Sequence, residues 1–180
     1  MEKILVDKEC TFKPNIIKNY KSFYMSSTIE NRIAELGYSL PQLPVSKGIY
    51  KRCVQSGHLL FSSGCISVNN DGSPITGKLG DDCSDEKGKD AARQCGLAML
   101  AAIKESIGSL DKIDRVVKLL GMVNATSDYT NHPVIINGCS ELFRDVFGEE
   151  NGVGARSAVG VASLPGNVAV EIEAIFELKD

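Results

Sequence analysis

Two apolar segments near the C-terminus carry charged residues whose types could do chemistry. Arg156 opens the run Arg-Ser-Ala-Val-Gly-Val, and Glu171 lies within Val-Glu-Ile-Glu, residues 170–173. A guanidinium grips a carboxylate through two parallel hydrogen bonds. A glutamate close by can accept a proton from water or hold a water molecule for attack. Together, the two groups are what a site for a small carboxylate-bearing substrate requires.

The two segments are expected to form a hairpin with a four-residue loop at 164–167. In that register Arg156 and Glu171 share one face with small residues, and the other face, toward the helices, carries Ser157, Val159, Val161, Val168, Val170 and Ile172. The two charges are then about 13 Å apart along the strand, at ~3.3 Å per residue. The long arginine side chain, a bulge or a different register has to bring them together. A salt bridge between Arg156 and an acid at an interface is the alternative interpretation of this spacing.

Helix signals flank the central part of the chain. Ser84 is a good N-cap for a helix over 85–107 that Gly108 ends. One stripe of that helix consists of the apolar, mostly small residues Ala91, Ala92, Cys95, Ala98, Met99 and Ala102, so it can lie close to a sheet. Pro133 suits the first turn of a second helix that ends near Gly148. A short helix over 29–36 is also expected.

Strands are predicted at 50–55 and 58–62, joined by a hairpin turn at Ser56–Gly57, then at 65–68 and within 113–126. The element order is strand, strand, helix, strand, helix, strand, strand. This order predicts an α+β two-layer sandwich, a mixed sheet with two helices on one face. The other face would be bare and partly apolar, which predicts self-association. Residues 1–28 are interpreted as an N-terminal extension, and residues 29–180 as the domain.

Composition restricts the partners and the compartment. The 180 residues carry a net charge of -3, so binding to nucleic acid through phosphate neutralisation is disfavoured. No apolar run approaches the ~20 residues of a membrane span. Six cysteines without a CxxC pair indicate free thiols in a reducing compartment and no zinc site. We expect a cytoplasmic protein; a mitochondrial location is the alternative, although residues 1–24 contain no arginine.

The charged segments resemble the signature of the reactive intermediate deaminase (Rid) family, also called YjgF-like or endoribonuclease L-PSP. The matching residues are Ala155-Arg156-Ser157-Ala158-Val159, then Leu164, then Val170-Glu171-Ile172. Further segments are similar to the family at Tyr50, at Leu59–Gly64 with its Ser63-Gly64 turn, and at Ile136–Phe143 with Asn137. The segment Asn31–Gly37 with Leu40-Pro41 looks like the longer-chain branch of the family.

The resemblance implies a chorismate mutase-like fold and a homotrimer whose sheets form a central barrel, with clefts between subunits. It implies hydrolysis of 2-imino or enamine acids to 2-keto acids and ammonia, without a metal or organic cofactor. Arg156 and Glu171 would be the catalytic residues, the first binding the substrate carboxylate and the second positioning the attacking water. The substrate-binding residues would be Tyr50, Ser63, Gly64, Asn137 and Ala158.

The chain departs from the archetype at two positions, with Ala158 in place of a cysteine and Gly154 in place of a proline. Two other functions stay open from the sequence. The older family name suggests an endoribonuclease or translation inhibitor. The negative net charge and the small number of histidines, two, disfavour this function. A non-catalytic trimer that binds a metabolite is the other.

Overall fold

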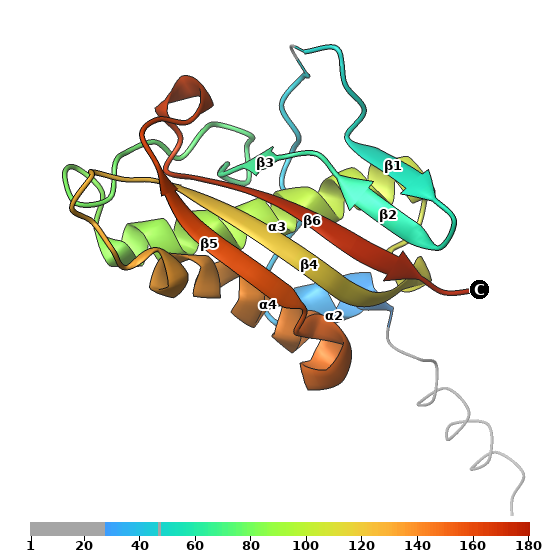
Figure 1. Ribbon diagram of the computed structural model, residues 1–180. Helices are drawn as coiled ribbons and strands as arrows, with labels where there is room; N and C mark the ends of the chain where they lie inside the picture. The colour runs from blue at the N-terminus through green and yellow to red at the C-terminus, as the bar shows by residue number, and fades with distance from the viewer. Residues whose placement is uncertain (1–27, 47) are drawn as a thin grey trace, which may run out of the picture.

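The computed structural model describes residues 28–46 and 48–180, and a six-stranded mixed sheet forms one of its layers (Figure 1). The strands are β1 (Cys53–Ser56), β2 (Leu59–Ser62), β3 (Cys65–Ile66), β4 (Ile113–Asn124), β5 (Ala155–Val161) and β6 (Val170–Leu178). Their order is β1-β2-β6-β4-β5, and β3 pairs with the start of β6. Among these described strands, β4 and β5 are the one parallel pair. The predicted hairpin at residues 56–57 is present as β1 and β2.

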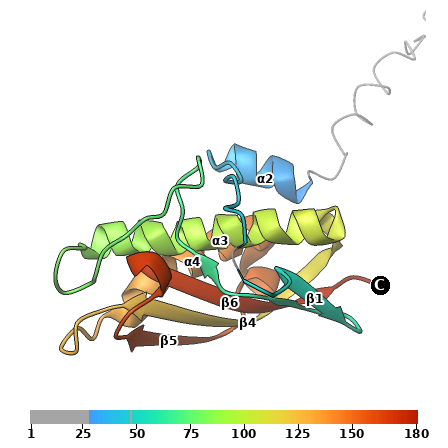
Figure 2. The same ribbon diagram turned by 90° about the horizontal axis from the view of Figure 1, so that it is seen from above.

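Two long helices, α3 (Asp85–Ile107) and α4 (His132–Gly152), cover one face of the sheet (Figure 2). A third helix, α2 (Ile29–Glu35), packs against α4, and short 3-10 turns lie at Leu110–Lys112 and Pro165–Asn167. Ser84 caps α3 by accepting a hydrogen bond from the Lys87 N–H, and Gly108 ends it in the left-handed conformation, as predicted. None of the helices in the described part of the chain combines the length and the apolar character needed to cross a bilayer.

Small residues bring the helices close to the sheet and to each other. All six residues of the predicted stripe on α3 are buried, and the Cys95 thiol lies 3.3 Å from the Val170 carbonyl of β6. Where α4 crosses α3, a Cβ at Gly138 would overlap the Lys89 carbonyl. The layers therefore depend on glycine, alanine and cysteine at their contacts.

None of the helices formed by residues 28–46 and 48–180 lies on the opposite face of the sheet, and we call this the open face. Apolar side chains stand on it, among them Val54, Phe61 and Val159, which are 50%, 39% and 42% exposed. Within the described part of the chain, the prediction of one covered and one bare, partly apolar face is confirmed. Self-association through this face stays a prediction, as does the division of the chain at residue 28, because residues 1–27 lie outside the described part.

The expected hairpin between the last two strands is wrong. Strand β4 lies between β5 and β6, and α4 is the crossover that makes β5 parallel to β4. The connection from β5 to β6 passes the end of β4 instead. There the fully buried Asn124 donates its side-chain amide to the Gly77 carbonyl at 2.9 Å and to Asn167 Oδ1 at 3.0 Å.

This topology inverts the predicted face of β5 and keeps that of β6. Arg156 is the register partner of Leu119, which is 2% exposed under the helices. Arg156 and Ala158 therefore face α4, while Val159 stands on the open face. Glu171 is the partner of Met122 and leaves the sheet on the open side, as predicted. The two charges thus lie on opposite faces of one sheet, and the predicted shared face is wrong.

Candidate functional site

Helix α4 and strand β5 hold Arg156 in a small polar group that we call the Arg156 cluster. Nη1 of Arg156 donates to Asn137 Oδ1 at 2.8 Å and to Ser140 Oγ at 3.0 Å. Asn137 and Ser140 are three residues apart on α4, so both side chains reach the same strand. All three residues are half-buried.

The guanidinium of Arg156 has no acidic partner within the described ranges 28–46 and 48–180. Two of its five N–H groups are used by the neutral oxygens of Asn137 and Ser140. The remaining N–H groups have no acceptor among the described residues, so the fork can still grip an anion. No salt bridge of Arg156 forms within the described residues of one chain, and the alternative interpretation, a salt bridge to an acid at an interface, stays a prediction.

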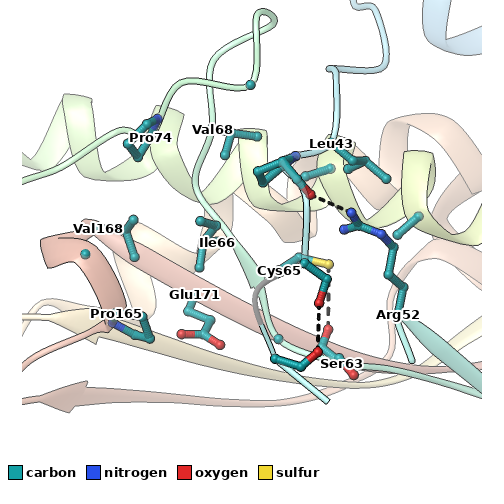
Figure 3. Close-up of a pocket in the computed structure, with 18 of the residues that line it drawn as sticks. Leu43, Arg52, Ser63, Cys65, Ile66, Val68, Pro74, Pro165, Val168 and Glu171 are labelled. Carbon is teal, nitrogen blue, oxygen red and sulfur yellow. Dashed lines mark hydrogen bonds between the residues drawn. The ribbon is translucent and has the colours of Figure 1, made fainter. Parts of the chain in front are cut away.

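A cavity of about 670 Å³ lies beside Glu171, and we call it the Glu171 pocket (Figure 3). Its polar lining comes from the loop before β1, from the Ser63-Gly64 turn and from β6, in the residues Tyr50, Arg52, Ser63, Gly64 and Glu171. The remainder is mostly apolar and includes Leu43, Pro44, Ile66, Val68, Pro74, Ala98, Ala102 and Val168. A large apolar hollow with a few convergent polar groups is the usual form of a small-molecule site.

Glu171 is held where its carboxylate is poorly solvated. Burial raises the pKa of Glu171, and the negative charge of Glu173 on the same face of β6 raises it further. Gly64 lies directly against this carboxylate, since a Cβ at Gly64 would overlap Glu171 Oε1. A half-buried carboxylate with a raised pKa, in a pocket, is typical of a group that moves protons.

Two hydrogen bonds from Ser63 to backbone carbonyls fix the Ser63-Gly64 turn against residues 51–52, which directly precede β1. Ser63 N–H donates to the Arg52 carbonyl at 2.8 Å, and Ser63 Oγ donates to the Lys51 carbonyl at 2.7 Å. The Arg52 side chain reaches the other way and donates from Nη2 to the Pro44 carbonyl at 2.6 Å. Arg52 therefore links two walls of the Glu171 pocket.

Cys65 also lines the pocket, and its surroundings disfavour the thiolate form. Burial is the main cause that raises its pKa to about 12, and its thiol lies 3.6 Å from the Ser63 carbonyl. The thiol is consequently protonated at neutral pH. Among the described residues, no group of three or more histidine, cysteine or acidic side chains is placed to hold a metal ion.

The structure divides the predicted site residues into two sets. Asn137 and Arg156 are hydrogen-bonded, and Ala158 lies two residues along the same face of β5. The second set, Tyr50, Ser63, Gly64 and Glu171, lines the Glu171 pocket. Each set is coherent by itself, but one chain does not bring them together.

Sequence reasoning missed Ser140 and Arg52. Ser140 follows Asn137 at the spacing of one helical turn, which was a usable signal. Arg52 follows Tyr50 by two residues, the spacing at which residues of an extended chain point to the same side.

Local packing accounts for one departure from the family pattern. A Cβ at Gly154 would lie 2.6 Å from the Val116 carbonyl oxygen and 2.9 Å from that of Val117, so no larger residue fits there without a shift. Ala158 is half-buried and packs against the core.

The fold is an α+β arrangement with helices on one side of a mixed sheet and a cavity beside Glu171. Residues 30–176 match the family described as "YjgF/chorismate_mutase-like, putative endoribonuclease". The chain belongs to this YjgF/Rid family, and its fold is the family's α+β, chorismate mutase-like fold.

Curated relatives cover most of the chain. Protein TCP17 of Trypanosoma cruzi is 38% identical over 159 residues, spanning 88% of this chain and 99% of that protein. The 2-iminobutanoate/2-iminopropanoate deaminase of Escherichia coli K12 is 35% identical over 133 residues, spanning 73% of this chain and 89% of the enzyme.

Solved structures agree with the fold. The Agrobacterium tumefaciens protein Atu1372, whose function is given as unknown, superposes with a TM-score of 0.77 at 39% identity, covering 89% of this chain and 98% of that one. A Shewanella oneidensis protein described as a "putative endoribonuclease" superposes with a TM-score of 0.79 at 28% identity. The superposition covers 84% of this chain and 99% of that one.

Proposed function

We propose that this protein hydrolyses reactive 2-imino acids, or their enamine tautomers, to 2-keto acids and ammonia. The observation that carries the proposal is the Arg156 guanidinium, which two neutral side chains hold and no acidic partner in the described chain neutralises. A deaminase named for 2-iminobutanoate and 2-iminopropanoate is among the relatives. Both of those compounds carry the carboxylate that such a cation would bind.

Arg156 and Glu171 divide the work. Arg156 binds the substrate carboxylate with its uncommitted N–H groups, and Asn137 and Ser140 fix the orientation of the guanidinium. Glu171 accepts a proton from a water molecule while that water adds to the imine carbon, so a C–O bond forms and the C=N electron pair moves to nitrogen. That proton passes to the nitrogen and gives a carbinolamine. Glu171 then takes the hydroxyl proton and delivers it to the same nitrogen, so the C–N bond breaks, ammonia leaves and the carbonyl forms.

Positioning accounts for most of the proposed rate gain. An imine in water already hydrolyses by itself, so aligning water, carboxylate and C=N bond is sufficient. Burial raises the pKa of Glu171, which makes its carboxylate a stronger base than that of an exposed glutamate. Tyr50 and the Ser63-Gly64 turn would orient the imine nitrogen beside it.

We further propose that the site is completed between two copies of the chain. Arg156 faces α4 and Glu171 leaves the other side of the sheet, so one copy cannot present both groups to one small acid. The apolar open face supports the association that would bring the Arg156 cluster of one copy to the Glu171 pocket of its neighbour. A homotrimer with three such clefts is the assembly that we propose.

Subunit mixing tests the chemistry and the assembly together. An amino-acid oxidase generates the imine, and the loss of semicarbazide-trapped product reports its hydrolysis. Arg156→Ala and Glu171→Gln, each strongly impaired alone, should regain part of the activity when the two chains are co-expressed, because some clefts then combine an intact arginine with an intact glutamate. Wild-type protein that does not exceed the uncatalysed rate would reject the deaminase function. Single variants that lack activity and show no recovery on mixing would reject the shared site only.

A further inference from the structure

The Glu171 pocket is much larger than a four-carbon imino acid. Its volume is about 670 Å³. A four-carbon imino acid needs about 200 Å³ even if every heavy atom receives the ~30 Å³ share of a water molecule. Cavities in this size range usually bury most of the surface of a drug-sized ligand. The size therefore points beyond the smallest substrates.

The polar and apolar groups of the pocket are separated in space. Figure 3 shows the Glu171 carboxylate between Pro165 and Ser63, with Ile66 next to it. Leu43, Val68 and Pro74 lie on the far side of Ile66 from that carboxylate (Figure 3). A substrate whose reacting carbon lies at Glu171 would thus extend its side chain along an apolar wall.

Helix α3 makes room for this wall. Its lining residues Ala98 and Ala102 are 3% and 1% exposed, so they belong to the packed layer between helix and sheet. Their side chains are single methyl groups, which occupy little of the cavity. On the opposite side Leu43 is half-buried, and the Arg52 hydrogen bond to the Pro44 carbonyl holds that segment in place. The space is consequently bounded on both sides by described residues.

We propose that the pocket selects 2-imino acids with a large apolar side chain, branched aliphatic or aromatic. The inference rests on the proposed deaminase activity and specifies its substrate class. Each additional methylene buried against the wall raises kcat/KM roughly fourfold. The imine of leucine should therefore exceed the imine of 2-aminobutyrate by at least about tenfold.

The preference for large apolar side chains is tested with imines that are generated in the assay mixture. An amino-acid oxidase converts leucine, phenylalanine, alanine or 2-aminobutyrate, and semicarbazide trapping gives kcat/KM for each imine. Leu43→Trp fills the apolar end and should remove most of the preference for the leucine imine. Leu36→Trp, at another half-buried leucine, lies outside the pocket and should keep it.

The outcomes separate the substrate class from the activity itself. Equal rates for small and large imines, or a preference for small ones, overturn the substrate class while the deaminase function stands. No acceleration of any imine overturns the function on which the inference rests. Thermal shifts of the wild type with 4-methyl-2-oxopentanoate and 2-oxobutyrate give a readout that does not depend on the Leu43 variant folding. A crystal structure in which side chains of another copy fill the wall would also overturn the inference.

Discussion

Arg156 offers the sharpest test of the proposed chemistry, because the structure sets the size of the effect. A substrate carboxylate would take two hydrogen bonds from N–H groups that are not engaged by Asn137 and Ser140. A hydrogen bond to a charged group is worth about 1.5–3 kcal/mol, so losing two removes about 3–6 kcal/mol. Because the cluster is only half-buried, the lower part of this range applies. Arg156→Ala should reduce kcat/KM about 10²–10³-fold.

The conservative variant separates charge from geometry. Arg156→Lys keeps a cation but loses the planar fork, so it should retain more activity than the alanine variant and still fall about tenfold or more below the wild type. The assay is semicarbazide competition on in-situ imines, with the uncatalysed rate subtracted. Arg144→Ala is the matched control, because Arg144 lies on the same helix α4 and, among the described residues, forms its salt bridge with its neighbour Asp145.

Two results would refute this reasoning. The first is an Arg156→Ala variant that hydrolyses imines within about threefold of the wild type, since a lost charge-assisted pair must cost more. The second is an equal loss in Arg144→Ala, which would show that the effect does not depend on the cluster. Melting curves accompany both variants, so that unfolding is not read as lost chemistry.

Three further changes follow from the geometry. Glu171→Gln should abolish turnover yet raise Tm at neutral pH. Burial raises the pKa of the carboxyl in the folded state, so its ionisation destabilises the fold as pH rises. The gain in Tm should therefore vanish below the pKa of the unfolded glutamate, about 4.3. A Tm gain that persists at pH 3 would contradict this origin. Gly64→Ala should displace the Glu171 carboxylate and lower kcat by about 10²-fold with little change in far-UV circular dichroism. Phe61→Glu places a charge on the open face and should turn the oligomer into monomers in light scattering, whereas a monomeric wild type would refute the association.

Local signals in the sequence predicted most of the elements. Ser84 and Gly108 define the ends of α3, because a cap side chain and a left-handed glycine act on neighbouring backbone groups and need no tertiary partner. Glu171 was placed on the correct face of β6, since alternation along a half-buried strand depends only on that strand. These features are local, and the sequence contains them.

The face of β5 could not be predicted in the same way. Val159 and Val161 look like core residues, but β5 is an edge strand whose helix side carries Arg156, Ala158 and Gly160. Little space separates this side of β5 from α4, because a Cβ at Gly160 would overlap the His132 ring. Which strand lies between β5 and β6 depends on long-range pairing, and a loop of moderate length is compatible with both a hairpin and a crossover.

The placement of the guanidinium and the carboxylate on opposite faces of one sheet has a consequence for how the protein behaves at low concentration. If two copies supply one cleft, the activity per milligram must fall when the protein is diluted below the dissociation constant of the assembly. The rate of imine hydrolysis in a cell would then rise more steeply than in proportion to the amount of protein. The thermal transition should move with concentration over the same range.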